Sequence, residues 1–219
     1  IGNGITAVGY YNDGISLIDH TDSPFQFTHF SIGKDSISGT ECQSLKADQL
    51  GNLWIGTARR GLFKMDLTSK KLKQFGVDEG LNYFSVQSIY EDREQNIWVG
   101  TDLGLSLFTG EVFKLFNEED GLTNNIVWSV CNSAEGGLWL GTNNGLDYFD
   151  GKNFTQIPTS KELALLTVFE DSRGLLWAGT PGEGLVKYDR TSMQLNSLKD
   201  EKILPDQTVY SITEDRQGY

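Results

Sequence analysis

The stretch Leu53-Trp54-Ile55-Gly56-Thr57 returns three more times along this chain of 219 residues. The later copies are Ile97-Trp98-Val99-Gly100-Thr101, Leu138-Trp139-Leu140-Gly141-Thr142 and Leu176-Trp177-Ala178-Gly179-Thr180. Successive tryptophans are 44, 41 and 38 residues apart. A repeat of this length is typical of solenoids, propellers and other repeat arrays.

Two further elements accompany each copy at a nearly constant distance. A Gly-Leu pair follows the tryptophan by six or seven residues, at Gly61-Leu62, Gly104-Leu105, Gly145-Leu146 and Gly184-Leu185. A hydroxyl residue and an aliphatic residue precede it, at Ser44-Leu45, Ser88-Ile89, Ser129-Val130 and Thr167-Val168, with a fifth pair at Ser211-Ile212. Between this second pair and the tryptophan, a motif such as Asp48 to Gly51 predicts a tight turn. The Asp side chain caps its own backbone, and Gly allows a positive φ.

Apolar residues alternate along each predicted strand, which indicates short β-strands and excludes helical repeats. Third strands are predicted at 62–66, 105–108, 146–149 and 185–188, and a fourth strand closes each repeat. A small four-stranded sheet cannot bury both faces alone and has to stack on its neighbours. The sequence therefore predicts an all-β fold, a β-propeller of four-stranded antiparallel blades, with the tryptophans packed between blades.

About five blades fit the length, in a single propeller region spanning residues 1–219. We expect a partial first blade at 1–33, complete repeats at 34–77, 78–117, 118–157 and 158–200, and the first strand of another blade at 201–219. The predicted strand 209–213 closes a five-bladed ring if it joins the strand at 5–10. Otherwise the chain is part of a larger ring with two unpaired edges, which could also pair in a homodimer.

Composition narrows the range of partners. Thirty acidic residues against eighteen basic ones give a formal charge of −12, so nucleic acid is not an expected partner. The two cysteines, Cys42 and Cys131, form no metal or redox motif, and we expect neither a metal nor a cofactor. The sequence has no apolar run of spanning length and no starting Met, and we expect it to be a piece of a longer protein.

The motifs resemble the two-component regulator propeller repeat. The resemblance rests on Val86 to Asp92, Asn96 to Thr101 and Gly104-Leu105, and again on Asp48 with Gly51 to Thr57. It implies the periplasmic sensor region of a membrane-bound histidine kinase that responds to a carbohydrate, with the kinase outside these residues. This family usually builds seven-bladed rings, and the first blade here departs from the pattern because it lacks the tryptophan.

Candidate ligand-binding residues are those that break the internal symmetry at one end of the blades. Turns between second and third strands differ between blades, and the first strand varies two residues before its aliphatic position. The candidates are Arg59, Arg60, Trp128, Asn143, Asn144 and Tyr210. Paired arginines suit a carboxylate or sulfate, and exposed aromatic rings suit a sugar face, so we expect an acidic oligosaccharide. The alternatives are a solvated arginine pair and aromatic rings that fill gaps between blades.

Catalytic residues are not predicted. Both histidines, His20 and His29, fall in the degenerate first blade, and no nucleophile or phosphate-binding motif is present. The acidic pairs Glu91-Asp92, Glu170-Asp171 and Glu214-Asp215 recur before the same turn, so we interpret them as turn-capping scaffold. A propeller lyase or hydrolase and a protein-interaction platform remain as alternatives to the sensor, because a fold does not determine a function.

Overall fold

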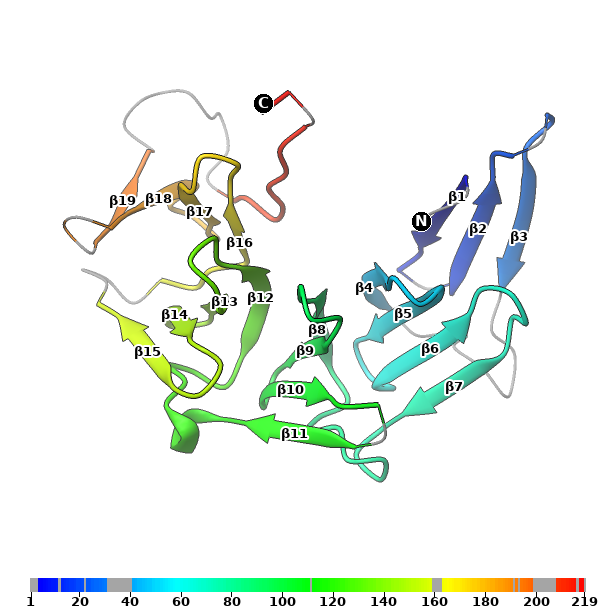
Figure 1. The fold of residues 1–219 in the computed structure, drawn as a ribbon, viewed down its shortest axis with the longest axis horizontal. Coiled ribbons are helices and arrows are strands. Elements are labelled where there is room, and N and C mark those ends of the chain that lie inside the picture. The colour runs from blue at the N-terminus through cyan, green and yellow to red at the C-terminus, as the bar shows by residue number, and fades with distance from the viewer. Residues whose placement is uncertain are drawn as a thin grey trace. The chain divides into compact units, whose positions relative to one another are not determined.

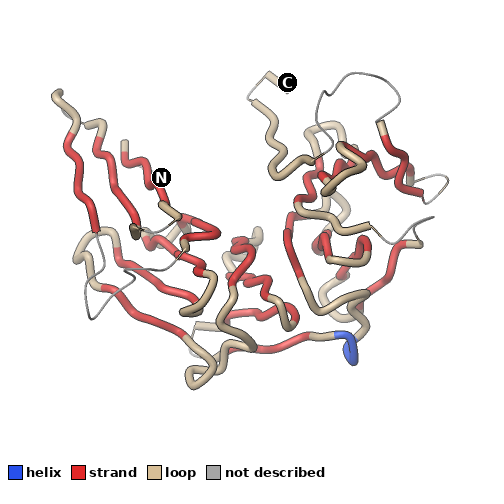
Figure 2. Tube along the Cα trace, turned by 180° about the vertical axis from the view of Figure 1, so that it is seen from behind, coloured by secondary structure: helices blue, strands red, loops and turns tan. Residues whose placement is uncertain are grey.

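The computed structural model confirms the all-β class. It describes residues 4–11, 13–21, 23–30, 41–110, 112–158, 163–190, 192, 194–198, 208–215 and 217–218. Its only helix in these ranges is one 3-10 turn at Glu118–Asp120. Strands account for nearly all of the regular structure (Figure 2).

The strands form five antiparallel sheets, each following the order of the chain (Figure 1). Blade 1 has three strands, β1 (Ile5–Gly9), β2 (Ile15–Asp19) and β3 (Gln26–Phe30). Blade 2 contains β4 (Cys42–Ala47), β5 (Asn52–Thr57), β6 (Leu62–Asp66) and β7 (Leu72–Phe75), and blade 3 contains β8 (Val86–Glu91), β9 (Ile97–Thr101), β10 (Gly104–Phe108) and β11 (Phe113–Phe116). Blade 4 contains β12 (Val127–Asn132), β13 (Leu138–Thr142), β14 (Gly145–Phe149) and β15 (Phe154–Ile157), and blade 5 contains β16 (Thr167–Glu170), β17 (Leu176–Gly179), β18 (Leu185–Asp189) and β19 (Gln194–Ser197).

The repeated residues make the turns that the sequence predicts. Asp48 Oδ1 accepts hydrogen bonds from the backbone N–H groups of Leu50 and Asn52, at 3.0 and 2.7 Å, and Gly51 takes a φ of 84°. The repeated threonine serves the next turn, because Thr57 Oγ1 donates to the carbonyl oxygen of Gly61 at 2.8 Å. Local hydrogen bonds thus close the first two hairpins of blade 2.

The repeated tryptophan and glycine pack between neighbouring blades. Trp54 is 1% exposed and joins a core cluster with Val86, Val99 and Phe108 of blade 3. Trp98 and Trp139 are also buried, whereas Trp177 is partly exposed. A Cβ on Gly179 would stand only 2.4 Å from the carbonyl oxygen of Val209, so the glycine permits close approach of the following segment.

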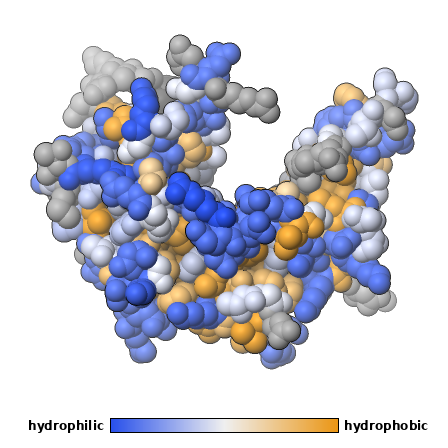
Figure 3. Space-filling model, in the orientation of Figure 1, coloured by the Kyte–Doolittle hydropathy of each residue, from blue (hydrophilic) through white to orange (hydrophobic). Residues whose placement is uncertain are grey.

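Two compact units divide the chain, Ile1–Thr101 with Ser106–Lys114, and Asp102–Leu105 with Leu115–Tyr219. The first unit holds blades 1 and 2 and most of blade 3, and the second holds blades 4 and 5. Hydrophilic side chains cover much of the surface visible in Figure 3. Within the described ranges, no helix has the length and hydropathy that a membrane-spanning segment needs.

The predicted strand at residues 209–213 is wrong. These residues adopt no strand conformation, and the only pairing at this end is an isolated bridge between Thr208 and Pro181. Among the described residues, blade 1 is a sheet of three strands. A strand needs a partner strand along its length. At residues 209–213 the pairing stops after the bridge at Thr208 and the hydrogen bond from Val209 N to Thr180 O. The predicted repeat boundaries near residues 33 and 200 lie outside the described residues.

Candidate functional site

A β-bulge marks the variable first-strand position in three blades. In blade 4, Val127 pairs with Thr142 and Ser129 pairs with Gly141, which leaves Trp128 without an opposite residue. Gln43 in blade 2 and Gln87 in blade 3 occupy the same kind of bulge. A bulge turns its extra side chain away from the regular alternation of the strand. The residue that differs from blade to blade is therefore the unpaired residue of the bulge in each of these three blades.

The bulge brings Trp128 to the turn that carries Asn143 and Asn144. The indole Nε1 of Trp128 donates to Asn143 Oδ1 at 3.3 Å, and the ring itself is partly exposed. The turn is held by two bonds, from Asn143 N to Ile126 O at 3.0 Å and from Asn144 N to Thr142 Oγ1 at 3.2 Å. Three of the six candidate residues thus form one group, with a ring face beside amide donors and acceptors.

Tyr210 belongs to the same unit but not to this group. It is 78% exposed and follows Thr208, which bridges to Pro181 in the turn of blade 5. Within the part of the chain that the structure describes, no hydrogen bond or ring contact joins Tyr210 to Trp128. Tyr210 therefore stands beside a different turn.

In the first unit, Arg59 and Arg60 play different roles. The guanidinium of Arg60 lies 5.9 Å from the centre of the Phe63 ring, and its backbone N donates to Thr57 Oγ1 at 3.1 Å. Arg59 is exposed. A hydrogen bond to Glu41 and the charge of Glu41 raise the pKa of Tyr11, and the nearby charge of Arg59 opposes that rise. Arg59 and the carboxylate of Glu41 thus both lie near Tyr11.

An aromatic pair that is not among the candidates from the sequence lies beside this turn. Tyr83 and Phe84 stack with ring centres 4.1 Å apart, and Phe84 is 41% exposed. The carbonyl oxygen of Phe84 accepts the N–H of Gly61 at 2.8 Å, which ties this loop to the arginine turn. Blade 4 has Asn124 and Asn125 in the corresponding loop, so the aromatic pair breaks the symmetry as the other candidates do.

The acidic pairs have scaffold roles, as predicted. Asp92 Oδ2 accepts the indole N–H of Trp98 at 2.7 Å within its own blade. The preceding glutamate instead reaches the previous blade: Glu91 Oε1 accepts the N–H of Gln49 at 2.9 Å, and Glu214 Oε2 accepts that of Ser172 at 2.9 Å. These carboxylates are occupied in holding turns and joining blades.

Burial and hydrogen bonds act in opposite directions on the Asp171 carboxyl. Burial raises its pKa, but the hydrogen bonds from Trp177, Leu175 and Arg173 outweigh burial and leave the pKa lowered. The ionised form is thus the one that this turn stabilises.

A serine, a histidine and an aspartate line up in blade 1, but not as a catalytic triad. Ser16 Oγ lies 2.9 Å from His29 Nδ1, and His29 Nε2 lies 3.5 Å from Asp13 Oδ2. Ser16 is only 7% exposed, while the Asp13 side chain is 71% exposed. A nucleophilic serine needs to reach a substrate, and its orienting carboxylate is normally the buried member. In blade 1 the serine is the buried residue and the aspartate is the exposed one.

No group of three or more His, Cys, Asp or Glu side chains in the described ranges lies close enough together to bind a metal ion.

The blades and their bulged first strands define this chain as a β-propeller assembled from tryptophan-bearing repeats. Residues 80–102 and 121–144 match the family model of the two-component regulator propeller. These two segments carry that family's repeat, which confirms the resemblance seen in the sequence. No curated protein sequence matches the chain.

Solved structures share the fold. One is the extracellular domain of BT3049 from B. thetaiotaomicron, described as a hybrid two-component system, with 24% identity and a TM-score of 0.81 over 100% of this chain and 31% of that one. Another is the extracellular domain of BT4673 from the same organism, with 21% identity and a TM-score of 0.81 over 100% of this chain and 30% of that one. A streptogramin B lyase matches with 16% identity and a TM-score of 0.65, over 87% of this chain and 64% of that one. The chain spans about a third of the length of the first two structures.

Proposed function

We propose that this chain is part of the ligand-binding propeller of a two-component sensor, that it works outside the cytoplasm, and that it recognises a carbohydrate. The observation that carries the proposal is the hydrogen bond between Trp128 and Asn143. It lies at a β-bulge within the segment 121–144 that matches the family model. A partly exposed indole face beside amide groups suits a sugar ring, because the apolar face of the sugar stacks on the aromatic ring and its hydroxyls bind the amides. A kinase elsewhere in the protein would receive the signal.

The arginine turn of the first unit supports an acidic sugar as the ligand. Arg59 is exposed, and the stacked pair Tyr83 and Phe84 lies beside the same turn. A carboxylate or sulfate on a glycan could pair with the guanidinium while a sugar ring contacts Phe84. The net charge of −12 makes such a cationic position selective, because most of the surface repels anions.

Two sets of variants test the proposal by titration calorimetry, after a glycan array on the purified chain has supplied a ligand. We expect Trp128→Ala to weaken neutral and acidic glycans about tenfold, and Trp128→Phe to retain most of the affinity, because it keeps a ring face. The Arg59→Ala, Arg60→Ala double variant should weaken acidic glycans only, with a loss that shrinks as salt rises. Arg93→Ala is the matched control, because Arg93 is exposed at the opposite strand ends of blade 3.

The site is wrong if Trp128→Ala binds every glycan like the parent. Absence of binding to any glycan would contradict the sensor proposal in its carbohydrate form and favour a protein partner.

A further inference from the structure

A buried side-chain contact joins the loop that leads into blade 4 to the third strand of that blade. Thr123 lies in this loop, at residues 121–126, and Asp147 lies fully buried on β14. The backbone N–H of Thr123 donates to Asp147 Oδ2 at 2.9 Å, and its hydroxyl donates to Asp147 Oδ1. One residue of the loop thus engages both oxygens of the buried carboxylate.

Blade 3 makes the same contact with the donor and the acceptor exchanged. Asn82 corresponds to Thr123, because each follows a Gly-Leu pair in its entry loop. Ser106 corresponds to Asp147, because each follows the Gly-Leu pair at the start of the third strand. In blade 3 the loop residue is the acceptor, since Asn82 Oδ1 accepts the hydroxyls of Ser106 at 2.8 Å and of Thr101 at 3.0 Å. Two blades therefore hold their entry loops in one way with different residues.

The scaffold of a blade does not need a polar residue at this strand position. The corresponding residues are Phe63 in blade 2 and Val186 in blade 5, and both are buried in apolar clusters. A buried carboxylate is costly unless it is well bonded, whereas an apolar residue of suitable shape stabilises a core directly. The role of Asp147 therefore lies in the loop that it holds.

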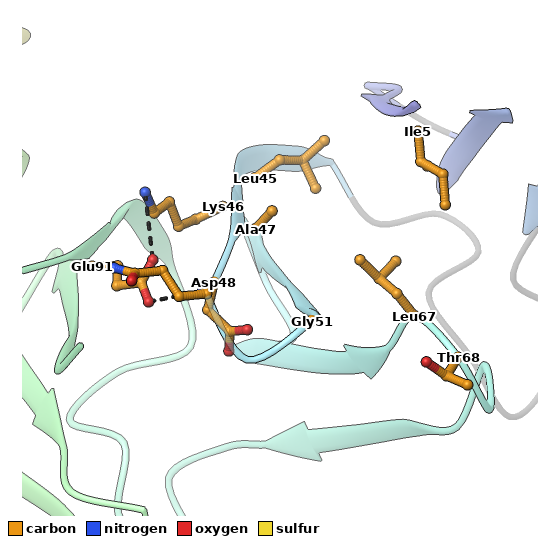
Figure 4. A pocket seen from close by; sticks show the side chains of 10 residues that line it. Ile5, Leu45, Lys46, Ala47, Asp48, Gly51, Leu67, Thr68 and Glu91 are labelled. Carbon is orange, nitrogen blue, oxygen red and sulfur yellow. Dashed lines mark hydrogen bonds and ion pairs between the residues drawn. The ribbon is translucent and has the colours of Figure 1, made fainter. Parts of the chain in front are cut away.

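Asp147 also differs from the buried carboxylates that join blades. Glu91, which lines the pocket shown in Figure 4, pairs with Lys46 of the preceding blade at 3.8 Å and accepts the N–H of Gln49. Asp147 has no ion pair with any described residue, and both of its bonds go to the loop at 121–126. Its carboxylate thus fixes a loop and does not connect two blades.

The loop that Asp147 fixes leads directly to the candidate site of blade 4. Ile126 ends the loop, and its carbonyl oxygen accepts the N–H of Asn143 at 3.0 Å. The N–H of Ile126 donates to Asn124 Oδ1 at 3.0 Å. Trp128 follows two residues later, and its indole donates to Asn143 Oδ1. The position of the loop therefore affects how the indole ring and the asparagine meet.

We propose that Asp147 and Thr123 form a positioning pair for the site at Trp128. A fixed loop lowers the conformational freedom that the site would otherwise lose when a ligand binds, so the pair raises affinity without touching the ligand. That the site binds a ligand rests on the proposed function, but the hold on the loop does not.

Hydrogen exchange of amide and indole N–H groups, followed by NMR, tests the hold on the loop without any ligand. In Asp147→Val we expect exchange of the loop amides and of the Trp128 indole N–H to rise at least about tenfold, because the loop opens more often. The amides of β17 in the same unit are the reference and should exchange as in the parent. Asp147→Asn should stay within about twofold of the parent, because its amide can still bond Thr123.

Thr123→Val decides the matter if Asp147→Val does not fold, because Thr123 is only partly buried and the variant removes only the hydroxyl donor. It should raise loop exchange about threefold, and Thr123→Ser should restore the parent rate. Ser106→Val is the matched control, because it breaks the corresponding contact of blade 3 and should leave the loop at 121–126 unchanged. Circular dichroism shows whether each variant is folded.

Calorimetry with a glycan whose binding depends on Trp128 tests the consequence for the site. We expect Asp147→Val to weaken that glycan about tenfold and Asp147→Asn to retain most of the affinity. Failure of the parent to bind any glycan would contradict the proposed function alone, because the exchange measurements need no ligand.

The positioning role is overturned if the folded valine variants exchange their loop amides like the parent. It is also overturned if exchange rises equally in β17, which would indicate general destabilisation, or if the asparagine and serine variants loosen the loop as much as the valine variants. Unchanged glycan affinity in an Asp147→Val protein with a loosened loop would overturn it as well.

Discussion

The indole Nε1 of Trp139 donates a hydrogen bond of 2.8 Å to Oε2 of Glu170, which belongs to the following blade. In blades 2, 3 and 5 the indole bonds to an aspartate of its own blade, six residues earlier, at Asp48, Asp92 and Asp171. Blade 4 has the buried Ser133 at that position. The loss of one carboxylate within a blade has thus been offset by a carboxylate from its neighbour.

Glu170 should therefore be a strong stabilising residue. Its side chain is 4% exposed, and besides Trp139 it accepts the N–H of Ala134 at 3.2 Å and pairs with Arg190 at 2.9 Å. We expect Glu170→Ala to lower the free energy of unfolding by about 3 kcal/mol, because three donors lose their acceptor. Urea unfolding measures this. Glu135→Ala is the control, because Glu135 also pairs with Arg190 but is 71% exposed, and it should cost less than about 1 kcal/mol. Equal losses would show that burial does not set the strength of this network.

The repeated tryptophans should differ in their contribution to stability. Trp54 is 1% exposed between two blades, whereas Trp177 is partly exposed although its indole also donates to Asp171, at 3.0 Å. Trp54→Ala should cost about 3–5 kcal/mol because it leaves a cavity. Trp177→Ala should cost clearly less, since less buried surface is lost. Denaturant unfolding of both variants checks the order, and a larger loss at Trp177 would contradict it.

Asp147 should make stability depend on pH. It is fully buried on β14 and accepts hydrogen bonds from the backbone N–H and the hydroxyl of Thr123. Burial raises the pKa of its carboxyl above the ordinary 3.8, and the bonds from Thr123 only partly oppose this. A raised folded-state pKa means that the contribution of Asp147 to stability is complete below pH 3.8 and is lost as pH rises through the folded pKa.

The variant Asp147→Asn isolates this effect, because an amide does not ionise and can still bond Thr123. We expect the parent to lose stability relative to the variant as pH rises from about 4 to about 7. Urea unfolding of both proteins at several pH values measures the difference. A constant difference across this range would show that Asp147 does not titrate as its burial implies.

Both thiols should react slowly in the native protein. Burial raises the pKa of Cys42 to about 11 and that of Cys131 to about 12, and neither forms a disulfide. The thiolate is the reactive form, so at pH 8 few thiols of either kind are reactive. An aromatic disulfide reagent should titrate two thiols in urea but react only slowly without it. Rapid native reaction at Cys42 would contradict this prediction.

The sequence by itself determined the blades. Alternating residues, the Asp48 to Gly51 turn and the Thr57 hydroxyl act within a few positions of the chain, so their pattern can be read without knowing the fold. The same local logic identified the acidic pairs as scaffold. It failed at residues 209–213, because a strand depends on a partner that the segment does not contain.

Tertiary structure alone decided how the repeats differ from one another. The asparagine that meets Trp128 and the glutamate that receives Trp139 both come from another strand or turn of the chain. Their contacts depend on where a bulge or a neighbouring blade places a side chain, and a repeat motif does not encode that placement. Equivalent positions in the sequence, such as Trp54 and Trp177, therefore differ in burial because their exposure depends on what packs against each blade.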